Sequence, residues 1–386
     1  YNILATYNKE ISDKFSFSVN AGASSEYHRY QQEYNATDGI IVPELYSLNN
    51  TAGNIIGSTY FTERSVNSLY GMLEFDFDNK LFLTLTGRTD KHSTLPTDNN
   101  SLFYPSVSLS TMASEWFELP DAINYLKAFG SWAQVRRSLG AYEINSYYDN
   151  AGTFDGSPEL SYSGSLVNPF IEGSLTTNLE LGFSAGFLNN KIGLDFAYYN
   201  AVDEDSIINL PISLGSGFSS RKENAHQFTT NGFEVSLRST PIKNTDFRWD
   251  FLANWTKKVQ RLTRLDEDAE QYNSLRLNDR TDAYYATVWE KSANGDLILD
   301  ANTGMPTKNP YQENIGNKNP DWSFGLENTF TYKDFSLKIG IDGVWGGLMR
   351  SLTVEKMWWG GKHPNSTEYR DAEYANGIGT VYVPTG

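Results

Sequence analysis

The sequence contains no cysteine and only 4 histidines among its 386 residues. The lack of cysteine excludes a disulfide framework and any thiolate metal site. His28, His92, His226 and His363 are scattered, and none has a neighbour at metal-ligand spacing, so we expect solvated surface histidines. No Gly-x-Ser-x-Gly nucleophile motif and no phosphate-binding glycine loop stands out. We therefore expect no enzyme activity, no bound cofactor and no metal centre.

Long apolar runs are also missing. Hydrophobic residues make up 39% of the chain, and the mean hydropathy is −0.48. No uninterrupted apolar stretch approaches the roughly 18 residues that a membrane helix needs. This excludes a bilayer-spanning helix but not a membrane β-barrel, whose strands are apolar only at every second position.

Positive charge is scarce. Lys and Arg number 31 against 47 Asp and Glu, which gives a net charge of −16. Nucleic-acid binding depends on neutralising phosphates with basic side chains. The composition therefore speaks against a nucleic-acid partner.

What the chain has in abundance is period-two alternation of apolar and polar residues. Two clear runs lie between residues 319 and 347 and are separated by only Lys333 and Asp334. Side chains on a strand alternate between faces, so each run predicts a strand with one apolar and one polar face, joined in a tight hairpin. Similar runs recur along the chain and predict about a dozen strands of roughly 10 residues, a length that suits a tilted strand crossing a bilayer. The runs lie near residues 3–7, 15–24, 69–78, 81–88, 106–110, 126–132, 178–187, 191–198, 233–238, 247–255, 323–332 and 335–345.

Short and long connections take turns between these runs. The long ones are expected at residues 25–66, 90–102, 135–174, 202–228, 257–320 and from 348 to the end. In an antiparallel meander, this rhythm places all long loops on one rim, as in transmembrane barrels. The polar faces carry many charges, which are costly to bury without partners but ordinary in a hydrated lumen. Trp249, Trp255, Tyr332, Phe335 and Trp345 lie near predicted strand ends, where interfacial aromatic girdles belong.

The sequence thus predicts an all-β, transmembrane, antiparallel up-and-down β-barrel with long extracellular loops. Two alternatives stay open. One is a soluble β-rich carbohydrate-binding module, because an antiparallel sheet with one solvated face also alternates. The other is a self-contained, 12-stranded porin-like or adhesin-like barrel.

Several sequence blocks resemble the SusC/RagA family of TonB-dependent outer-membrane transporters of Bacteroidetes. They span roughly residues 103 to 347 in the family's order. The most specific block is IGNKNPDW at residues 315–322. The others are FYPSVSL at 103–109, LKAFGSWAQ at 126–134, NGFEV at 231–235 and ATVWE at 286–290.

The resemblance implies a location, an activity and partners. Such proteins are 22-stranded barrels of the bacterial outer membrane, with an N-terminal plug, a TonB inner-membrane complex as energy source and a SusD-like surface lipoprotein as lid. They import oligosaccharides or peptides, and glycan is our first expectation. No plug and no closing C-terminal strands are found here, and the chain stops in a predicted long loop. We therefore expect residues 1–386 to be a partial barrel domain of about 12 strands, in contact with membrane lipid.

The predicted loops are rich in aromatic residues, whose flat faces suit sugar rings and peptides. Tyr285, Trp289, Trp358 and Trp359 are our candidate substrate-binding residues. The alternative is that these rings pack the loops together or meet the lid protein. Separately, residues 294–304 (NGDLILDANTG) place oxygen ligands in a glycine-containing loop. We favour a tight hairpin there over a calcium site, because Leu297, Ile298 and Leu299 occupy ligand positions.

Overall fold

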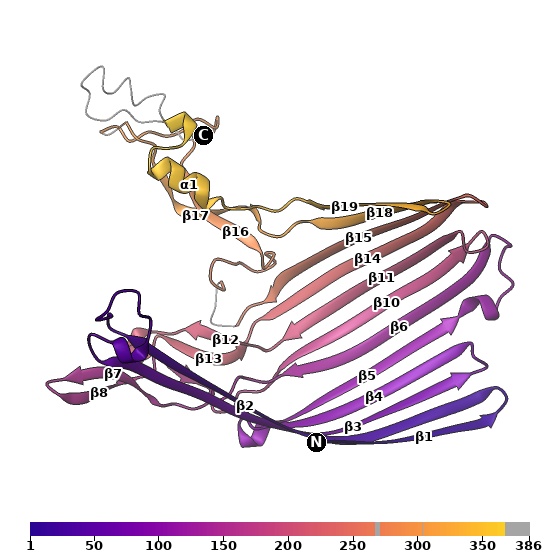
Figure 1. Cartoon of the computed structure of the whole chain (residues 1–386), viewed down its shortest axis with the longest axis horizontal. Helices are drawn as coiled ribbons and strands as arrows, with labels where there is room; N and C mark the ends of the chain where they lie inside the picture. The colour runs from indigo at the N-terminus through magenta and orange to yellow at the C-terminus, as the bar shows by residue number, and fades with distance from the viewer. Residues whose placement is uncertain (267–270, 303, 367–386) are drawn as a thin grey trace.

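The computed structural model describes residues 1–266, 271–302 and 304–366. Its main feature is one sheet of twelve antiparallel strands that follow each other as a meander (Figure 1). In sheet order the strands are β1 (Asn2–Ser12), β2 (Phe15–Thr37), β3 (Ile55–Phe77), β4 (Leu81–His92), β5 (Ser101–Met112), β6 (Ile123–Arg137), β10 (Ser174–Phe187), β11 (Ile192–Glu204), β14 (Gln227–Lys243), β15 (Phe247–Arg264), β18 (Trp322–Tyr332) and β19 (Phe335–Trp345).

The smaller elements lie in the long connections at one end of this sheet. Two hairpins, β7–β8 and β16–β17, and a three-stranded sheet of β12, β13 and β9 belong to this group. Their bounds are β7 (Tyr148–Phe154), β8 (Ser157–Tyr162), β9 (Ser165–Val167), β12 (Ser206–Pro211), β13 (Ser220–Ala225), β16 (Ala283–Trp289), β17 (Lys308–Asn317) and α1 (Leu352–Trp359), with short 3-10 helices at Leu48–Asn50, Thr97–Asn99, Leu214–Ser216 and Pro364–Ser366. A further 3-10 helix, Ala113–Glu115, lies in the connection between β5 and β6 at the opposite end of the sheet. In the described parts of the chain, no helix is long and apolar enough to cross a membrane.

Strand register keeps all apolar rows on the same face of the sheet. On β18 and β19, for example, Leu326 pairs with Ile341 and Phe330 pairs with Leu337. Ring contacts continue across the apolar face, from Phe183 to Phe196 at 5.6 Å and on to Phe233 at 6.2 Å. The predicted alternation is therefore realised as one continuous apolar surface backed by one continuous polar surface.

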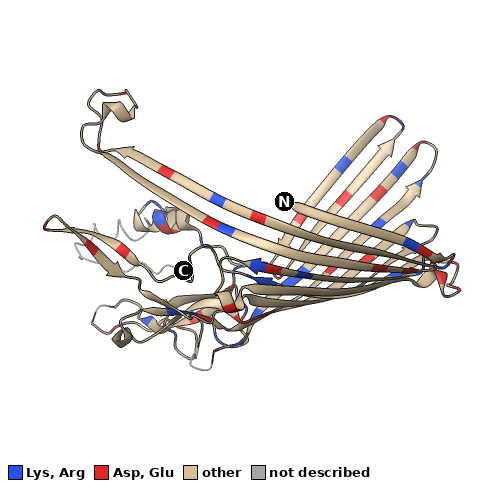
Figure 2. Ribbon diagram, turned by 90° about the horizontal axis from the view of Figure 1, so that it is seen from below, with Lys and Arg blue, Asp and Glu red and all other residues tan. Residues whose placement is uncertain are grey.

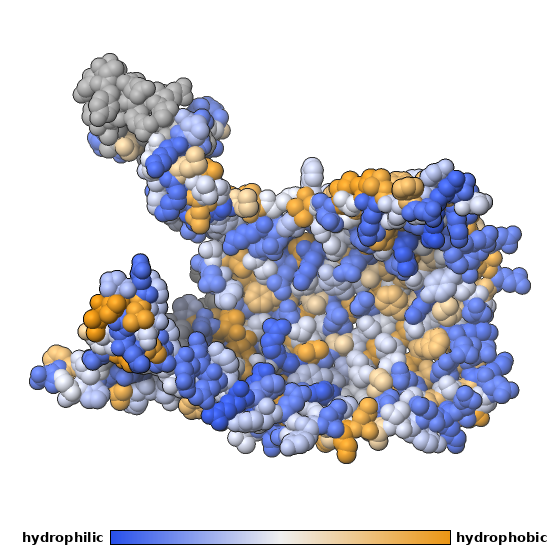
Figure 3. Space-filling model, in the orientation of Figure 1, coloured by the Kyte–Doolittle hydropathy of each residue, from blue (hydrophilic) through white to orange (hydrophobic). Residues whose placement is uncertain are grey.

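The apolar face of the sheet is not buried. Leu69 is 63% exposed and Phe335 is 78% exposed. The buried hydrophobic cluster lies elsewhere, at the loop end of the sheet. In Figure 3 the middle of the face turned toward the viewer is mostly hydrophilic, and apolar residues gather along the edge over β18 and β19. A soluble sandwich would pack its apolar face into a dry core, so this alternative is wrong.

Aromatic residues mark both ends of the apolar face on β18 and β19. Trp322 and Trp345 stack at 6.0 Å at the loop end. Tyr332 and Phe335 are paired at the turn end, ten residues away on the same strands. At about 3.4 Å per residue and a tilt near 45°, the two bands are about 24 Å apart along the membrane normal, which matches the apolar band of a barrel.

One exception in the apolar row has a local explanation. Asn328 lies on the apolar face of β18, among Leu326 and Phe330. Its side-chain oxygen accepts a hydrogen bond of 3.1 Å from the indole N–H of Trp249 on β15. The indole N–H and the side-chain oxygen of Asn328 thus satisfy each other within the apolar surface.

The structure corrects the predicted connection at residues 25–66. Most of this stretch is strand, because β2 and β3 pair without a register shift from Phe15 and Phe77 out to Thr37 and Ile55. The loop is confined to residues 38–54. The apolar alternation stops near residue 25 because the hairpin continues beyond the apolar band, where both of its faces meet water. The predicted final loop falls partly on residues 367–386, which lie outside the described residues.

The sheet has two edges. Among the described residues, β1 pairs only with β2 and β19 pairs only with β18. The structure therefore does not form the closed 12-stranded barrel that was one alternative.

Candidate functional site

The polar face forms the hollow side of the curved sheet. A cavity of about 1060 Å³ lies against it and is lined by Lys127, Ser184, Asp195, Glu234 and Asn254, among others. Figure 2 shows the sheet curving into an open trough, with acidic and basic residues alternating along its strands. This places the charged side chains where the lumen of a barrel would be.

Charges on the polar face neutralise each other in pairs across or along strands. Arg88 and Asp90 are 2.7 Å apart, and Lys338 and Glu327 are 2.8 Å apart. Such partly exposed pairs contribute little to stability, but they offset part of the charge on this face. The face can therefore hold water and polar solutes.

Large rings on the polar face lie over glycines of the neighbouring strand. A Cβ atom on Gly232 would be 2.2 Å from the ring of Tyr199, and one on Gly22 would be 2.4 Å from the ring of Tyr70. In both cases the ring and the glycine are directly opposed in register. Glycine is thus required at these positions so that the rings can lie flat against the sheet.

The long loops meet in a small hydrophobic cluster at one end of the trough. Leu95, Leu102, Leu139 and Ile171 are buried together; the first two come from the connection after β4 and the start of β5, and the other two from the connection between β6 and β10. Partly buried Ile207 packs against the same cluster. This cluster ties the connections after β4, β6 and β11 together, so the loops form a structured rim.

A partly buried ion cluster anchors the β16–β17 hairpin to the start of β18. Arg280 donates to both carboxylate oxygens of Asp282, at 2.9 and 2.8 Å, and to Asp321 at 2.5 Å. The backbone N–H of Asn319 donates to Asp282 at 3.0 Å. Burial raises the pKa of Asp282, but the hydrogen bonds from Arg280 and Asn319 outweigh it and leave this pKa below its usual value. Asn319 and Asp321 belong to the NKNPDW segment, which therefore positions the hairpin.

Two of the four candidate aromatic residues lie on β16. The hydroxyl of Tyr285 donates a hydrogen bond of 2.5 Å to Asp279, which raises the pKa of this tyrosine. Trp289 ends the strand and pairs with Lys308 of β17. The hydroxyl of Tyr285 is thus held by a hydrogen bond within the same connection.

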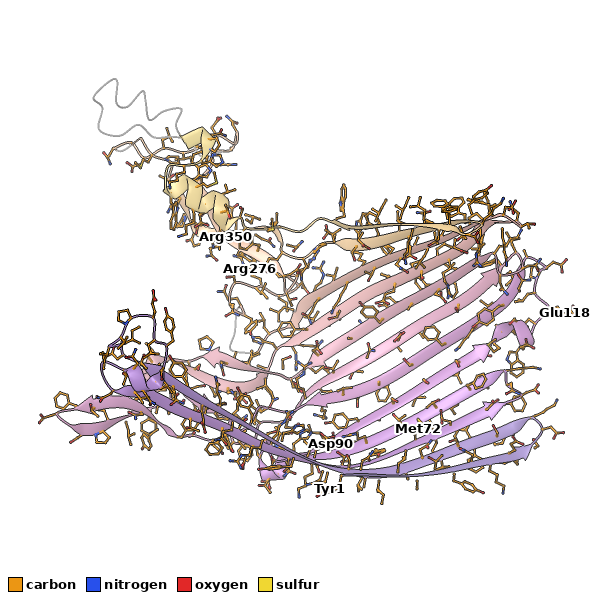
Figure 4. All side chains as sticks on the ribbon, viewed as in Figure 1. Tyr1, Met72, Asp90, Glu118, Arg276 and Arg350 are labelled. Carbon is orange, nitrogen blue, oxygen red and sulfur yellow. The ribbon has the colours of Figure 1, made fainter. Side chains whose placement is uncertain are left out.

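The other two candidates lie on α1. Trp358 stacks on the ring of His363 at 4.4 Å, whereas Trp359 is 73% exposed with Lys356 over its ring at 4.5 Å. Arg350, at the base of α1 in Figure 4, interacts with Tyr284 of β16. The structure therefore brings both elements to the same part of the rim, and Trp359 is the candidate most open to a ligand.

The expectation of solvated surface histidines is wrong for His226. This residue is only 1% exposed. Its Nδ1 accepts the backbone N–H of Asp266 at 3.0 Å, and burial lowers its pKa. The sequence did contain a signal for this position, because His226 directly precedes the residues of β14, where the apolar-polar alternation lies.

The suggested calcium loop forms a turned hairpin. Isolated bridges join Lys291 to Leu297 and Leu299 to Pro306. Among the described residues, which exclude Thr303, no group of three or more acidic or histidine side chains could hold a metal ion.

Comparison with known proteins extends these observations. A family model described as "TonB dependent receptor-like, beta-barrel" matches residues 2–385. The chain is 23% identical to TonB-dependent receptor P3 of Formosa agariphila, over 94% of this chain and 40% of that protein. It is 25% identical to TonB-dependent receptor SusC of Bacteroides thetaiotaomicron, over 74% of this chain and 31% of that protein.

Solved structures agree on the fold. The RagAB peptide importer in its 'closed-closed' state superimposes with a TM-score of 0.76 at 19% identity, covering 90% of this chain and 41% of that chain. The chain thus spans about two fifths of the length of these relatives, as the coverage of 40% and 41% shows. A family match over nearly all residues, together with apolar strand faces turned outward, shows that the chain belongs to the TonB-dependent receptor-like β-barrel family and is an outer-membrane protein.

Proposed function

We propose that this chain forms the barrel part of an energy-coupled transporter that imports oligosaccharides or peptides across the bacterial outer membrane. The observation that carries the proposal is the inverted polarity of the sheet. Apolar rows are exposed on one face, and a hollow of about 1060 Å³, lined in part by charged and polar side chains, lies against the other. A solute too polar for lipid would cross along that hollow.

The coupling machinery would come from the rest of the protein. Among the described residues, β1 and β19 each lack a second neighbouring strand. Unpaired strand edges are not tolerated in hydrocarbon. We therefore expect further strands to close the sheet into a larger barrel, and a plug domain to contact the TonB inner-membrane complex from the lumen. The relatives' greater length supports this expectation.

The loop end would dock a SusD-like surface lipoprotein. Apolar side chains are unusually exposed there, including Tyr46 at 87% and Leu214 at 77%. They lie beyond the apolar band of the sheet, so lipid does not cover them. A lid protein that buries these side chains would close the trough over its cargo, and Trp359 would be free to stack on a sugar ring or a peptide side chain.

Uptake by living cells tests the proposal. A strain that lacks the gene is expected to lose growth on the oligosaccharide or peptide cargo, and the intact gene restores it. Restoration should disappear in a strain without TonB or in the presence of a protonophore. Growth that persists without TonB would contradict energy coupling and favour a passive pore. Trp359→Ala should weaken cargo affinity, whereas an unchanged affinity would remove this residue from the site.

A further inference from the structure

A second cavity lies away from the central trough, beside the part of the β2–β3 hairpin that extends past the sheet. β4 ends at His92, opposite Val66, so residues 55–65 of β3 have no β4 neighbour on that side. The register of β2 and β3 is uninterrupted over this extension. Residues at even positions therefore continue the polar face of the sheet beyond the membrane.

The cavity has a volume of about 1000 Å³ and two walls. One wall is the hairpin, mostly its polar-face residues, and the other is the connection after β6, at residues 140–147. From the hairpin come His28, Arg29, Tyr30, Tyr60, Thr62 and Arg64, and from the connection Gly140, Ala141, Tyr142, Glu143, Asn145 and Tyr147. This volume lies at the upper end of the range for small-molecule sites.

Arg64 is the key charge in this cavity. Among the described residues it has no hydrogen-bond or ion-pair partner, although the whole chain carries a net charge of −16. The nearby carboxylates are occupied by other groups. Glu26 contacts the ring of His28 at 3.2 Å, and Glu143 contacts Lys222 at 2.7 Å. An unneutralised guanidinium is therefore held open on the cavity wall.

Aromatic rings flank this guanidinium. Tyr30 and Tyr60 are edge to face with ring centroids 6.3 Å apart, and Tyr147 lines the opposite wall. A guanidinium binds planar anionic groups through two parallel hydrogen bonds, and flat rings beside it suit the body of a sugar or a peptide. The two features together describe a site for a flat unit that carries a negative charge.

We propose that this cavity is a subsite for an anionic group, a carboxylate or sulfate, carried by the oligomer that the protein takes up, with Arg64 as the residue that binds it. The inference rests on the proposed import function and adds a charge preference to it. The subsite would capture acidic oligomers at the outer rim, before they reach the trough.

Binding measurements on protein purified from outer membranes in detergent test the subsite. Two matched probe pairs separate charge from scaffold: tri-galacturonate against galactotriose, and tri-aspartate against tri-asparagine. We expect the acidic member of at least one pair to bind about tenfold or more tightly than its neutral partner. The pair that shows this difference identifies the scaffold, and equal affinity within both pairs would overturn the proposal.

Variants assign the effect to Arg64. Arg64→Gln is expected to reduce affinity for the acidic probe by about tenfold or more and to leave the neutral probe unaffected. Arg64→Lys keeps the charge but not the two parallel donors, so it should lose less. The matched control is Arg264→Gln, because Arg264 does not line this cavity and is already 2.8 Å from Asp205. If Arg264→Gln and Arg64→Gln lower affinity equally, the effect is general charge and the assignment is wrong.

The salt dependence of probe binding is measured on the unsubstituted protein, so its result does not depend on whether a variant folds. Raising sodium chloride from about 50 to about 500 mM screens exposed charges, so it should weaken the acidic probe selectively. Salt-independent binding would overturn the proposal. The uptake experiment is separate: TonB-dependent growth with no preference for acidic probes refutes only the subsite, whereas acidic binding without TonB-dependent growth refutes the import function.

Discussion

Replacing a single membrane-facing leucine by arginine gives the sharpest test of the inverted polarity. Leu181 lies on the apolar face of β10, six residues before Phe187 at the turn end. This separation corresponds to about 20 Å along the strand and about 14 Å along the membrane normal, close to the middle of the bilayer. An arginine at the midplane of a barrel costs about 2–4 kcal/mol. We therefore expect Leu181→Arg to lower the folded-to-unfolded ratio by about 30-fold to 800-fold.

The neighbouring residue provides the control. Glu180 is adjacent in sequence but points to the polar face, where it is opposed by Ser131. Glu180→Arg introduces the same side chain into the hydrated trough, so we expect a change within about 0.5 kcal/mol. The assay is the midpoint of heat-modifiable gel migration and of urea unfolding for protein extracted from outer membranes. Equal destabilisation by both variants, or a larger loss at Glu180, would refute the assignment of the two faces.

Three further perturbations have definite expected outcomes. Arg280→Ala removes the shared partner of Asp282 and Asp321 in a partly buried ion cluster and should cost about 1–3 kcal/mol locally, seen as faster proteolysis of the connection between β15 and β18, while slow cleavage would contradict it. Because the pKa of Asp282 is lowered in the folded protein, its stabilisation is present above the ordinary value near 4 and is lost as pH falls through the folded value. The protection of the β16 amides, corrected for the intrinsic pH dependence of hydrogen exchange, should therefore fall there, and a loss of protection above about pH 5 would contradict the reasoning. Gly232→Val should impair assembly, because the Cβ atom of the new valine would overlap the ring of Tyr199. The control is Gly340→Val, which should assemble normally because a Cβ atom at this position has no neighbour within 4 Å. Equal membrane yields of the two variants would refute the steric argument.

The sheet could be predicted from the sequence because one physical rule governs it. Each strand separates lipid from water, so every second residue is apolar, and all twelve strands of the main sheet were expected close to where they lie. The rule fails where the environment becomes the same on both faces. Beyond residue 25, β2 is exposed to water on both sides, its pattern of polar and aromatic residues loses contrast, and a loop was predicted instead of a strand.

The loop region was harder to predict because its order comes from contacts between distant segments. Leu95, Leu139 and Ile171 bury one another although they are far apart in sequence. The position of His226 likewise depends on the backbone of Asp266, which belongs to another connection. Among the candidate aromatic residues, the sequence correctly suggested loop positions but could not distinguish Trp359, which is open, from Tyr285, which is held by Asp279.

The overhanging β2–β3 hairpin has a mechanical consequence. Its last twelve or so residues reach about 40 Å past the point where the sheet leaves the bilayer. A lone two-stranded ribbon is only marginally stable in water. Its tip is therefore expected to bend relative to the sheet, at the level of the connection at residues 140–147. A molecule bound in the cavity between this connection and the hairpin would restrict the bending. The mobility of the tip would then depend on whether the cavity is occupied.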